Sequence, residues 1–284
     1  MNAAELRERA NFIGSSDVPA ILGFSRCRTP KDVWLEKTKR LEPKPSTNEP
    51  AEFGRMVEPV LVEWASVKLG RNALTNVLAH HPEHAFMRAQ LDGVTDRPLA
   101  VIEAKAYGLF NPRWDGREWG LEGTDHIPRD VMAQVNFAMA CSGAESGHVV
   151  ALLGGGMGVR VYHLERNERL VRAIEDACLR FWNENVKADV PPDAPAGLEA
   201  LKHVIREPGS FTEIDHDWPD KWLSLKDQQA LIEGAVEDAK RAILEEMGEH
   251  EEGVTPFGRF SYRANVKGSR VFRYHGPALV EDER

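Results

Sequence analysis

Two carboxylates and a lysine with the spacing of a metal-dependent hydrolytic site occur near residue 100. Asp92 is followed by Glu103 and Lys105, which interrupt an otherwise apolar run over residues 99–105 (LAVIEAK). Side chains alternate between faces along a strand, so Glu103 and Lys105 share one face. A hairpin with the strand ending at Asp92 brings the second carboxylate alongside. Clustered oxygen ligands suit Mg²⁺ or Mn²⁺, which lowers the pKa of a bound water and polarises a phosphodiester.

The same spacing also occurs on ordinary surface hairpins, whose charged side chains face solvent. The apolar neighbours of Glu103 and Lys105 favour a buried strand instead, where an unpaired charge is costly. On that interpretation Asp92 and Glu103 hold the ion, and Lys105 either orients the attacking water or offsets charge on the phosphate.

The elements that must position these residues follow from hydrophobic periodicity and turn residues. We expect a β-hairpin over 91–105 with its turn at 96–98, and a helix over 53–69 that rests on the core through Val57, Val60, Leu61 and Trp64. Ser15, Ser16 and Asp17 supply a capping side chain for a short helix. Further helices are predicted over 15–22, 128–141 and 170–185, and strands over 147–153 and 159–164. This order predicts an α/β domain with a mixed central sheet flanked by helices.

A composition break follows, with three prolines in the five residues 191–195. It predicts a boundary between a domain at 1–190 and a C-terminal extension at 191–284. A long amphipathic helix is expected over 219–248, as an oligomerisation or partner surface or packed back on its own core. A hairpin over 254–276 interleaves basic and aromatic residues, so we expect it to contact nucleic acid. The phosphate contacts would come from Arg259, Arg263, Arg270 and Arg273, and stacking from Tyr262 or Tyr274.

Composition excludes several classes of protein. The chain has 284 residues, 42% hydrophobic and 29% charged, which is typical of globular rather than disordered or collagen-like proteins. Its three cysteines are far apart, so a disulfide framework or cysteine-bound metal is not indicated. With no apolar run of membrane-spanning length and no apolar signal core, a cytoplasmic protein is expected. The net charge of −9 is unusual for a nucleic-acid binder, so DNA contact is expected from local basic patches.

Several short stretches, taken in order, resemble the YqaJ-type viral recombinase and phage lambda-type exonuclease family, a branch of the PD-(D/E)XK nucleases. They are IGSSD (13–17) with ILG (21–23), TP (29–30) with WLEK (34–37), FGRMVE (53–58), MRAQLDG (87–93), IEAK (102–105) and MAQV (132–135). Two positions depart from the family pattern: Leu91 replaces a usual proline, and Asn136 stands where a second glutamine is often found. The resemblance implies a restriction-endonuclease-like core over residues 1–190.

The resemblance implies roles for individual residues. Asp92 and Glu103 match metal-binding acids, the backbone carbonyl of Ala104 matches a further ligand, and Lys105 matches the catalytic lysine. Together they would hold one or two Mg²⁺ or Mn²⁺ ions.

Other matches retain an alternative interpretation. Glu58 matches a helix-borne acid that reaches a second metal, or is an ordinary charge in the first turn of a helix. Gln134 matches an active-site glutamine, or faces solvent. Ser16, next to Ser15 and with Arg9 upstream, matches a serine that receives a terminal 5′ phosphate, although a helix cap would need the same serine.

The implied activity is that of a Mg²⁺-dependent DNA exonuclease of phage recombination. It would digest linear duplex DNA from 5′ to 3′ and leave 3′ single strands for an annealing protein, in a bacterial cytoplasm and from a phage or prophage gene. The family includes ring-shaped trimers, so a homo-oligomer is expected. The alternatives are an endonuclease or other DNA-processing nuclease of the same fold, such as a CRISPR-adaptation type trimming enzyme, and a non-catalytic DNA-binding or scaffolding protein.

Overall fold

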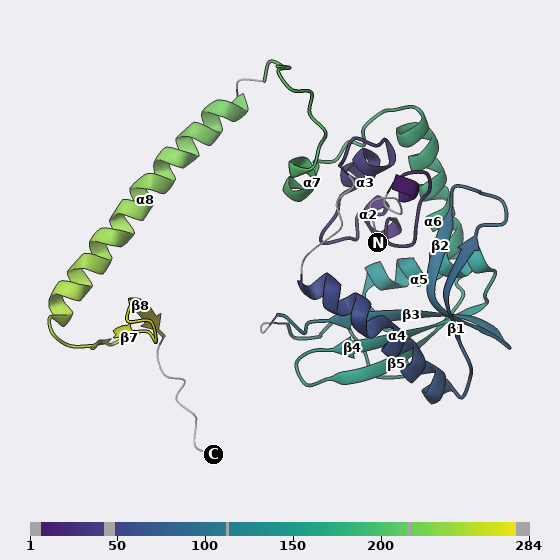
Figure 1. Cartoon of the computed structure of the whole chain (residues 1–284), viewed down its shortest axis with the longest axis horizontal. Helices are drawn as coiled ribbons and strands as arrows, with labels where there is room; N and C mark the ends of the chain where they lie inside the picture. The colour runs from purple at the N-terminus through teal and green to yellow at the C-terminus, as the bar shows by residue number, and fades with distance from the viewer. Residues whose placement is uncertain (1–6, 43–48, 112–113, 215–216, 277–284) are drawn as a thin grey trace. The chain divides into compact units, whose positions relative to one another are not determined.

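The protein is described by a computed structural model that covers residues 7–42, 49–111, 114–214 and 217–276. The chain forms two compact units, Met1–Glu207 and Pro208–Arg284, and each is described on its own (Figure 1). None of the helices in the described ranges combines the length and the apolar character that a membrane span needs.

A five-stranded mixed sheet forms the centre of the first unit. Its strands, in spatial order, are β1 (Leu74–His80), β2 (Arg88–Asp96), β3 (Leu99–Tyr107), β4 (Ser146–Leu153) and β5 (Gly158–Glu165). β3 and β4 are parallel, and the other neighbours are antiparallel. Parallel neighbours need a crossover, which here contains α5 (Arg129–Ser142). The predicted hairpin, strands and mixed sheet are confirmed.

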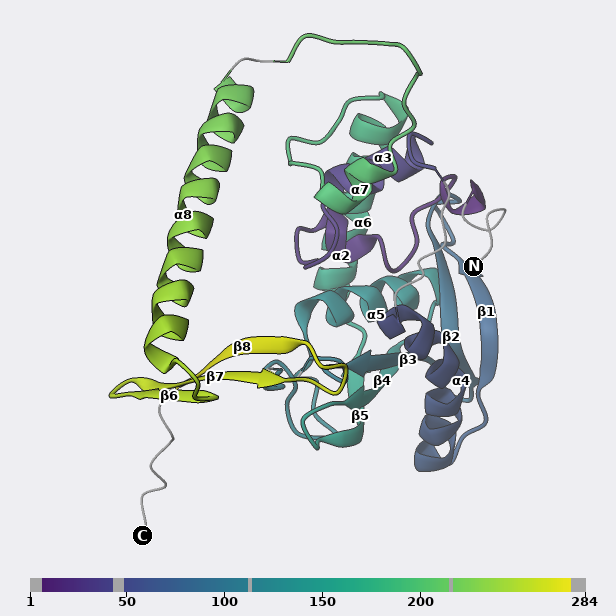
Figure 2. The same cartoon turned by 60° about the vertical axis from the view of Figure 1, so that its left-hand side comes forward.

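Helices pack on both faces of this sheet (Figures 1 and 2). α4 (Glu49–Leu69) covers the face that includes Ile102. The opposite face, which includes Val101, packs against α5, and the same core takes in α2 (Val18–Ile21), α3 (Pro30–Lys37) and α6 (Glu168–Arg180). α6 runs into a π-helical segment, Phe181–Lys187. The alternation of Val101 and Ile102 is the period-two pattern of a strand that is buried on both faces.

The face that α4 presents to the sheet differs from the prediction. Val60 and Trp64 were expected in the core, but their exposed fractions are 63% and 46%. Leu61 is buried as predicted, and Val62 and Ala65 are buried in place of Val60 and Trp64. The helix has two adjacent apolar stripes, one with Val60 and Trp64 and one with Val62 and Ala65. The second stripe contacts the sheet.

The segment after the prolines remains attached to the first unit. The backbone N–H of Gly197 donates to Asp32 Oδ1 at 2.7 Å. The N–H of Ile205 donates to the Arg40 carbonyl at 2.8 Å, and Leu41 forms a β-bridge with Val204. The short helix α7 (Leu198–Lys202) lies in this segment. Residues up to 207 are therefore part of the first compact unit.

The second unit is a long helix followed by a small sheet (Figure 2). α8 (Asp217–Met247) is followed by β6 (Glu252–Thr255), β7 (Gly258–Ala264) and β8 (Arg270–His275). These strands form an antiparallel sheet of three strands, in which β7 and β8 are the predicted hairpin and β6 is an additional strand. The extra strand arises because residues 252–255 pair with β7 through a tight turn at 256–257.

Candidate functional site

The predicted acidic residues and lysine lie where β2 and β3 separate. Pairing between the two strands ends at Gly93 and Ile102, whereas β2 stays paired with β1 beyond this point. At the fork, Asp92 Oδ2 accepts a hydrogen bond from the backbone N–H of Ala104 at 2.8 Å. The Asp92 carboxylate therefore replaces the backbone partner that a regular ladder would supply, and it is held against β3.

Glu103 and Lys105 form an ion pair at the same fork. Lys105 Nζ donates to Glu103 Oε1 at 2.5 Å, and the exposed fractions of these side chains are 21% and 11%. Ala104, between them, packs on the opposite face with the α4 cluster. A solvated surface hairpin does not describe this strand, because its charged side chains are largely withdrawn from water.

Glu58 of α4 lies in the same electrostatic environment. Burial raises its pKa, the Glu103 carboxylate raises it further, and Lys105 lowers it. α4 approaches the sheet closely because Gly93 has no side chain: a Cβ there would lie 2.7 Å from Val62 Cγ1. Val62 is one helical turn after Glu58, so this contact fixes the distance of Glu58 from the sheet.

The fork holds more negative than positive charge. Burial and then the Glu103 carboxylate raise the pKa of Asp92 to about 8, with a smaller contribution from Glu58, although Lys105 opposes this. Burial alone would lower the pKa of Lys105, but Glu103 and Asp92 outweigh it and keep the pKa above its ordinary value. Three carboxylates thus share one ammonium group, which is an arrangement that a bound cation would stabilise.

The oxygen atoms at the fork fit a hard divalent cation. In the ranges that the structure describes, no three or more His, Cys, Asp or Glu side chains already stand at metal-ligand spacing. Mg²⁺ commonly takes only one or two carboxylates and keeps several waters. Asp92, Glu103 and the Ala104 carbonyl match that pattern.

α5 contributes polar groups that border this fork. Tyr107 donates to Asp130 Oδ2 at 2.8 Å, and the Asp130 carboxylate helps raise the pKa of Lys105. Gln134 follows Asp130 by one helical turn, and its Oε1 is buried without a hydrogen-bond partner among the described residues. Buried acceptors without a donor are costly and few in native structures. The Gln134 amide oxygen therefore does not simply face solvent.

No role for Tyr107 or Asp130 was predicted from the sequence. Tyr107 lies two residues after Lys105, which is the spacing of side chains on one face of a strand. Asp130 lies in the first turn of a predicted helix. The positions of Tyr107 and Asp130 within their elements could be read from the sequence. Their contact could not, because it depends on which helix packs against which strand in the folded protein.

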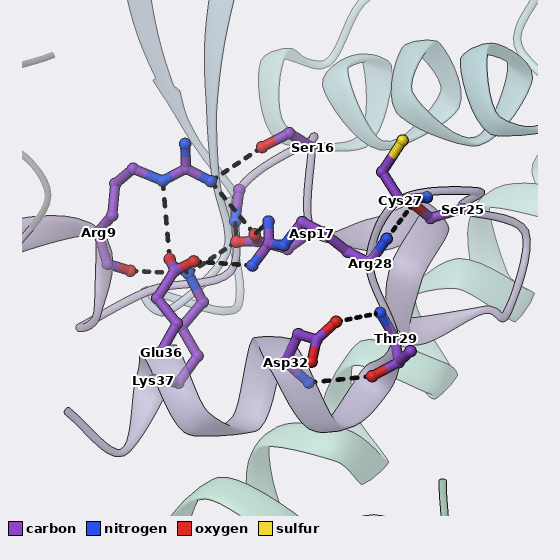
Figure 3. Close-up of polar contacts among 11 residues, drawn as sticks. Arg9, Ser16, Asp17, Ser25, Cys27, Arg28, Thr29, Asp32, Glu36 and Lys37 are labelled. Carbon is purple, nitrogen blue, oxygen red and sulfur yellow. Dashed lines mark hydrogen bonds and ion pairs between the residues drawn. The ribbon is translucent and has the colours of Figure 1, made fainter. Parts of the chain in front are cut away.

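Arg9 and Ser16 contact each other directly, through a hydrogen bond of 2.9 Å from Arg9 Nη2 to Ser16 Oγ (Figure 3). The predicted helix cap is wrong: Asp17 precedes α2, which has only four residues, and no side chain caps it. Ser15 Oγ is buried and has no hydrogen-bond partner among the described residues. The hydroxyl of Ser16 is therefore used by the Arg9 guanidinium and not by a helix terminus.

Asp17 is the centre of a charged cluster next to Ser16 (Figure 3). Its fully buried carboxylate pairs with Lys37 at 2.7 Å, Arg28 at 2.8 Å and Arg9 at 3.2 Å. Burial raises the pKa of Asp17, but these three cations outweigh it and hold the pKa far below its usual range. Glu36 pairs with Arg28 at 2.7 Å and with Lys37 at 2.9 Å. Three cations and two carboxylates leave the cluster with a net positive charge.

This cluster was not predicted from the sequence, although Asp17, Glu36 and Lys37 lie within the motifs that resemble the family. The available signal was the presence of several charged side chains in short helices that also supply buried apolar residues, such as Trp34 and Leu35. Arg28 lies outside the motifs IGSSD (13–17) and WLEK (34–37), which contain the other three residues.

The small C-terminal sheet separates its basic side chains from most of its aromatic ones. One face presents Arg259, Arg263 and Arg273. On this face Glu252 pairs with Arg263 at 2.8 Å and with Arg259 at 3.3 Å. Arg270 lies on the opposite face, with its guanidinium 5.8 Å from the centre of the Tyr262 ring. The four predicted arginines therefore do not form one surface.

The fold of the first unit is found in solved nuclease structures. The crystal structure of an alkaline exonuclease (LHK-Exo) from Laribacter hongkongensis is similar with a TM-score of 0.51 and 18% sequence identity, over 70% of this chain and 96% of that chain. The structure of LHK-Exo in complex with dAMP gives a TM-score of 0.51 and 19% identity, over 66% and 94% of the two chains. At this identity the likeness concerns the fold, and it agrees with the predicted nuclease-like core.

Sequence comparison agrees with the order of motifs. A Bacillus subtilis (strain 168) protein described as the uncharacterized protein YqaJ is 27% identical over an alignment of 259 residues that covers 87% of this chain and 79% of the relative. Residues 6–145 match the YqaJ-like viral recombinase domain. This stretch contains Arg9, Ser16, the β2–β3 fork and Gln134. Residues 6–145 therefore form a domain similar to that of the YqaJ-like viral recombinases.

Proposed function

We propose that this protein is a divalent-metal-dependent deoxyribonuclease of the phage recombination type. The observation that carries the proposal is the β2–β3 fork, where Asp92, Glu103 and Glu58 share the single ammonium group of Lys105. The match to a viral recombinase domain and the fold shared with an alkaline exonuclease favour DNA phosphodiester hydrolysis as the reaction.

In this mechanism Asp92, Glu103 and the Ala104 carbonyl would hold the metal, and Glu58 would serve a second ion. The metal supplies a water of lowered pKa and charge that offsets the phosphate. Lys105 Nζ donates to Glu103 Oε1 at 2.5 Å. It would act as a hydrogen-bond donor and positive charge that holds the attacking water or the phosphate. Gln134 Oε1 is an acceptor for that water or for substrate.

We further propose that the enzyme is an exonuclease that digests linear duplex DNA from 5′ to 3′ and passes 3′ single strands to an annealing protein. The positively charged cluster around Arg9 and Ser16 would receive a terminal 5′ phosphate, with the buried Ser15 hydroxyl beside it. The dAMP complex of LHK-Exo supports a nucleotide-binding role for the shared fold. A basic face on the C-terminal sheet would add contacts to the DNA backbone.

Linear and circular duplex DNA, each incubated with and without Mg²⁺, test the reaction class. Mg²⁺-dependent loss of linear DNA alone supports the exonuclease. Nicking of circular DNA would support an endonuclease. Metal-independent binding without cleavage would indicate a DNA-binding protein and would contradict the proposal.

Duplexes with a 5′ phosphate at one end and a 5′ hydroxyl at the other test the polarity. The enzyme should shorten the phosphorylated strand first, and Arg9→Ala or Ser16→Ala should reduce that preference. Arg40→Ala is the matched control, because Arg40 forms an exposed pair with Asp189 outside the cluster. An Arg9→Ala enzyme with the full preference would contradict the assignment.

A further inference from the structure

α8 has an apolar stripe that its own unit does not cover. Residues on this stripe are spaced alternately by four and three, and they are Trp218, Trp222, Leu225, Gln229, Ile232, Val236, Ala239 and Ile243. Exposed fractions are 68% for Trp218, 61% for Trp222 and 64% for Ile232. Among the described residues of α8, only Met247 is buried. An average spacing of 3.5 residues sustained over this length is the pattern of a coiled coil.

We propose that α8 pairs in antiparallel orientation with α8 of a second copy of this chain. The sizes of the side chains support this orientation. With the two-fold axis between residues 230 and 231, Trp222 faces the small Ala239 of the second copy, and Leu225 faces Val236. The largest residues thus meet smaller ones, as knobs-into-holes packing requires. A parallel, in-register pair would instead set each tryptophan against itself.

The charges that flank the stripe favour the same orientation. In the antiparallel pair, Lys226 lies beside Glu233 of the second copy, and the two-fold axis repeats this contact. In a parallel pair, Lys221 would lie beside Lys226 of the second copy, so like charges would meet. The side chains next to the stripe therefore discriminate between the two arrangements.

Gln229, the polar residue within the stripe, already has its hydrogen bonds inside the helix. Its Oε1 accepts from Lys226 Nζ at 3.0 Å, and its Nε2 donates to Glu233 Oε1 at 2.7 Å. A polar group at a buried interface is tolerated when its partners are present. Gln229 can therefore enter the interface without losing hydrogen bonds.

Disulfide cross-linking of the full-length chain tests the orientation. Cys27 is exposed, so Cys27→Ser is the background for Trp222→Cys and for Ala239→Cys. In the antiparallel pair residues 222 of the two copies are about 25 Å apart, so neither variant should cross-link alone. A mixture of the two should form a disulfide-linked dimer under oxidising conditions. Cross-linking of Trp222→Cys by itself, or no dimer in the mixture, would overturn the proposal.

Light scattering on the full-length protein tests the association itself, and each chain has a mass of 31.8 kDa. Ile232→Asp should weaken self-association at least tenfold, with α-helical circular dichroism retained. Leu231→Asp is the matched control, because Leu231 is 75% exposed but lies off the stripe. A single-chain mass for the wild type, a trimer unaffected by Ile232→Asp, or equal effects of the two variants would each refute the pairing.

Discussion

Gly93 of β2 lies so close beneath Val62 of α4 that a Cβ on residue 93 would be 2.7 Å from Val62 Cγ1. Gly93→Ala should therefore push α4 away from the sheet and move Glu58 with it. Overpacking of this kind costs about 1–3 kcal/mol. We expect a lower free energy of unfolding in urea and slower cleavage of linear duplex DNA.

Two variants control for other effects of the alanine. A Cβ on Gly54, in the same helix, meets nothing within 4 Å, so Gly54→Ala should stabilise the protein by about 0.5–1 kcal/mol. Val62→Ala removes the methyl groups that Gly93→Ala would strike, so adding it to Gly93→Ala should recover part of the lost activity. A double variant as slow as Gly93→Ala would argue that the close approach does not position Glu58.

Replacement of Lys105 by alanine removes the only ammonium group among three carboxylates. We expect cleavage to fall by at least about 100-fold, because the positive donor that would hold the water or phosphate is then missing. Circular dichroism should show that the variant still folds. Lys68→Ala is the control, since Lys68 is an exposed lysine at the end of α4. Retained activity in Lys105→Ala would overturn the site.

The hairpin at the centre of the site was predictable because its signals are local. Alternation along β3 places Glu103 and Lys105 on one face, and Asp96 to Pro98 has the composition of a turn. The end of pairing at Gly93 could not be predicted in the same way. It depends on the Asp92 carboxylate taking the Ala104 N–H, which is a contact between residues 12 apart.

Tertiary contacts also decided which predictions failed. Either of two apolar stripes on α4 could face the sheet. The stripe with Val62 does so because Gly93 has no side chain and leaves space for the Val62 methyl group. The composition break at the prolines is real, yet the Asp32 carboxylate binds the Gly197 N–H and keeps the following segment on the first unit. Neither contact has a signature in the spacing of residues along the chain.

Gln134 has a buried amide oxygen without a partner among the described residues. Gln134→Met keeps the shape of the side chain but removes this unpaired acceptor. The free energy of unfolding should stay the same or rise by about 1 kcal/mol, whereas cleavage should slow by about tenfold or more if the oxygen binds water or substrate. A glutamine with only a structural role would give the reverse, a stability loss with full activity.

Asp17 should make stability depend on acid pH. Its folded pKa lies below its ordinary value of 3.8, so the carboxylate stabilises the fold above that pH and loses its contribution as pH falls below it. At neutral pH, Asp17→Asn should cost about 3–5 kcal/mol, because the buried Lys37 loses its fully buried carboxylate and keeps only the partly exposed carboxylate of Glu36. The difference from wild type should shrink below about pH 4. Urea unfolding of both proteins across this range measures it.

The exposed pair of Asp189 with Arg40 provides the control for this titration. Asp189→Asn should leave stability close to that of the wild type at every pH, because exposed ion pairs contribute little. A difference between wild type and Asp17→Asn that does not change with pH would mean that the carboxylate charge is not what stabilises the cluster.

Arg273 and Arg270 lie on the same strand of the C-terminal sheet but on opposite faces, so they form a matched pair. If the basic face binds the DNA backbone, Arg273→Ala should weaken binding and reduce the slope of log K against log salt by about 1. Arg270 lies over the Tyr262 ring, so Arg270→Ala should leave that slope unchanged. If Arg270→Ala weakened binding and Arg273→Ala did not, the DNA would lie on the aromatic face. Base stacking would then supply much of the affinity.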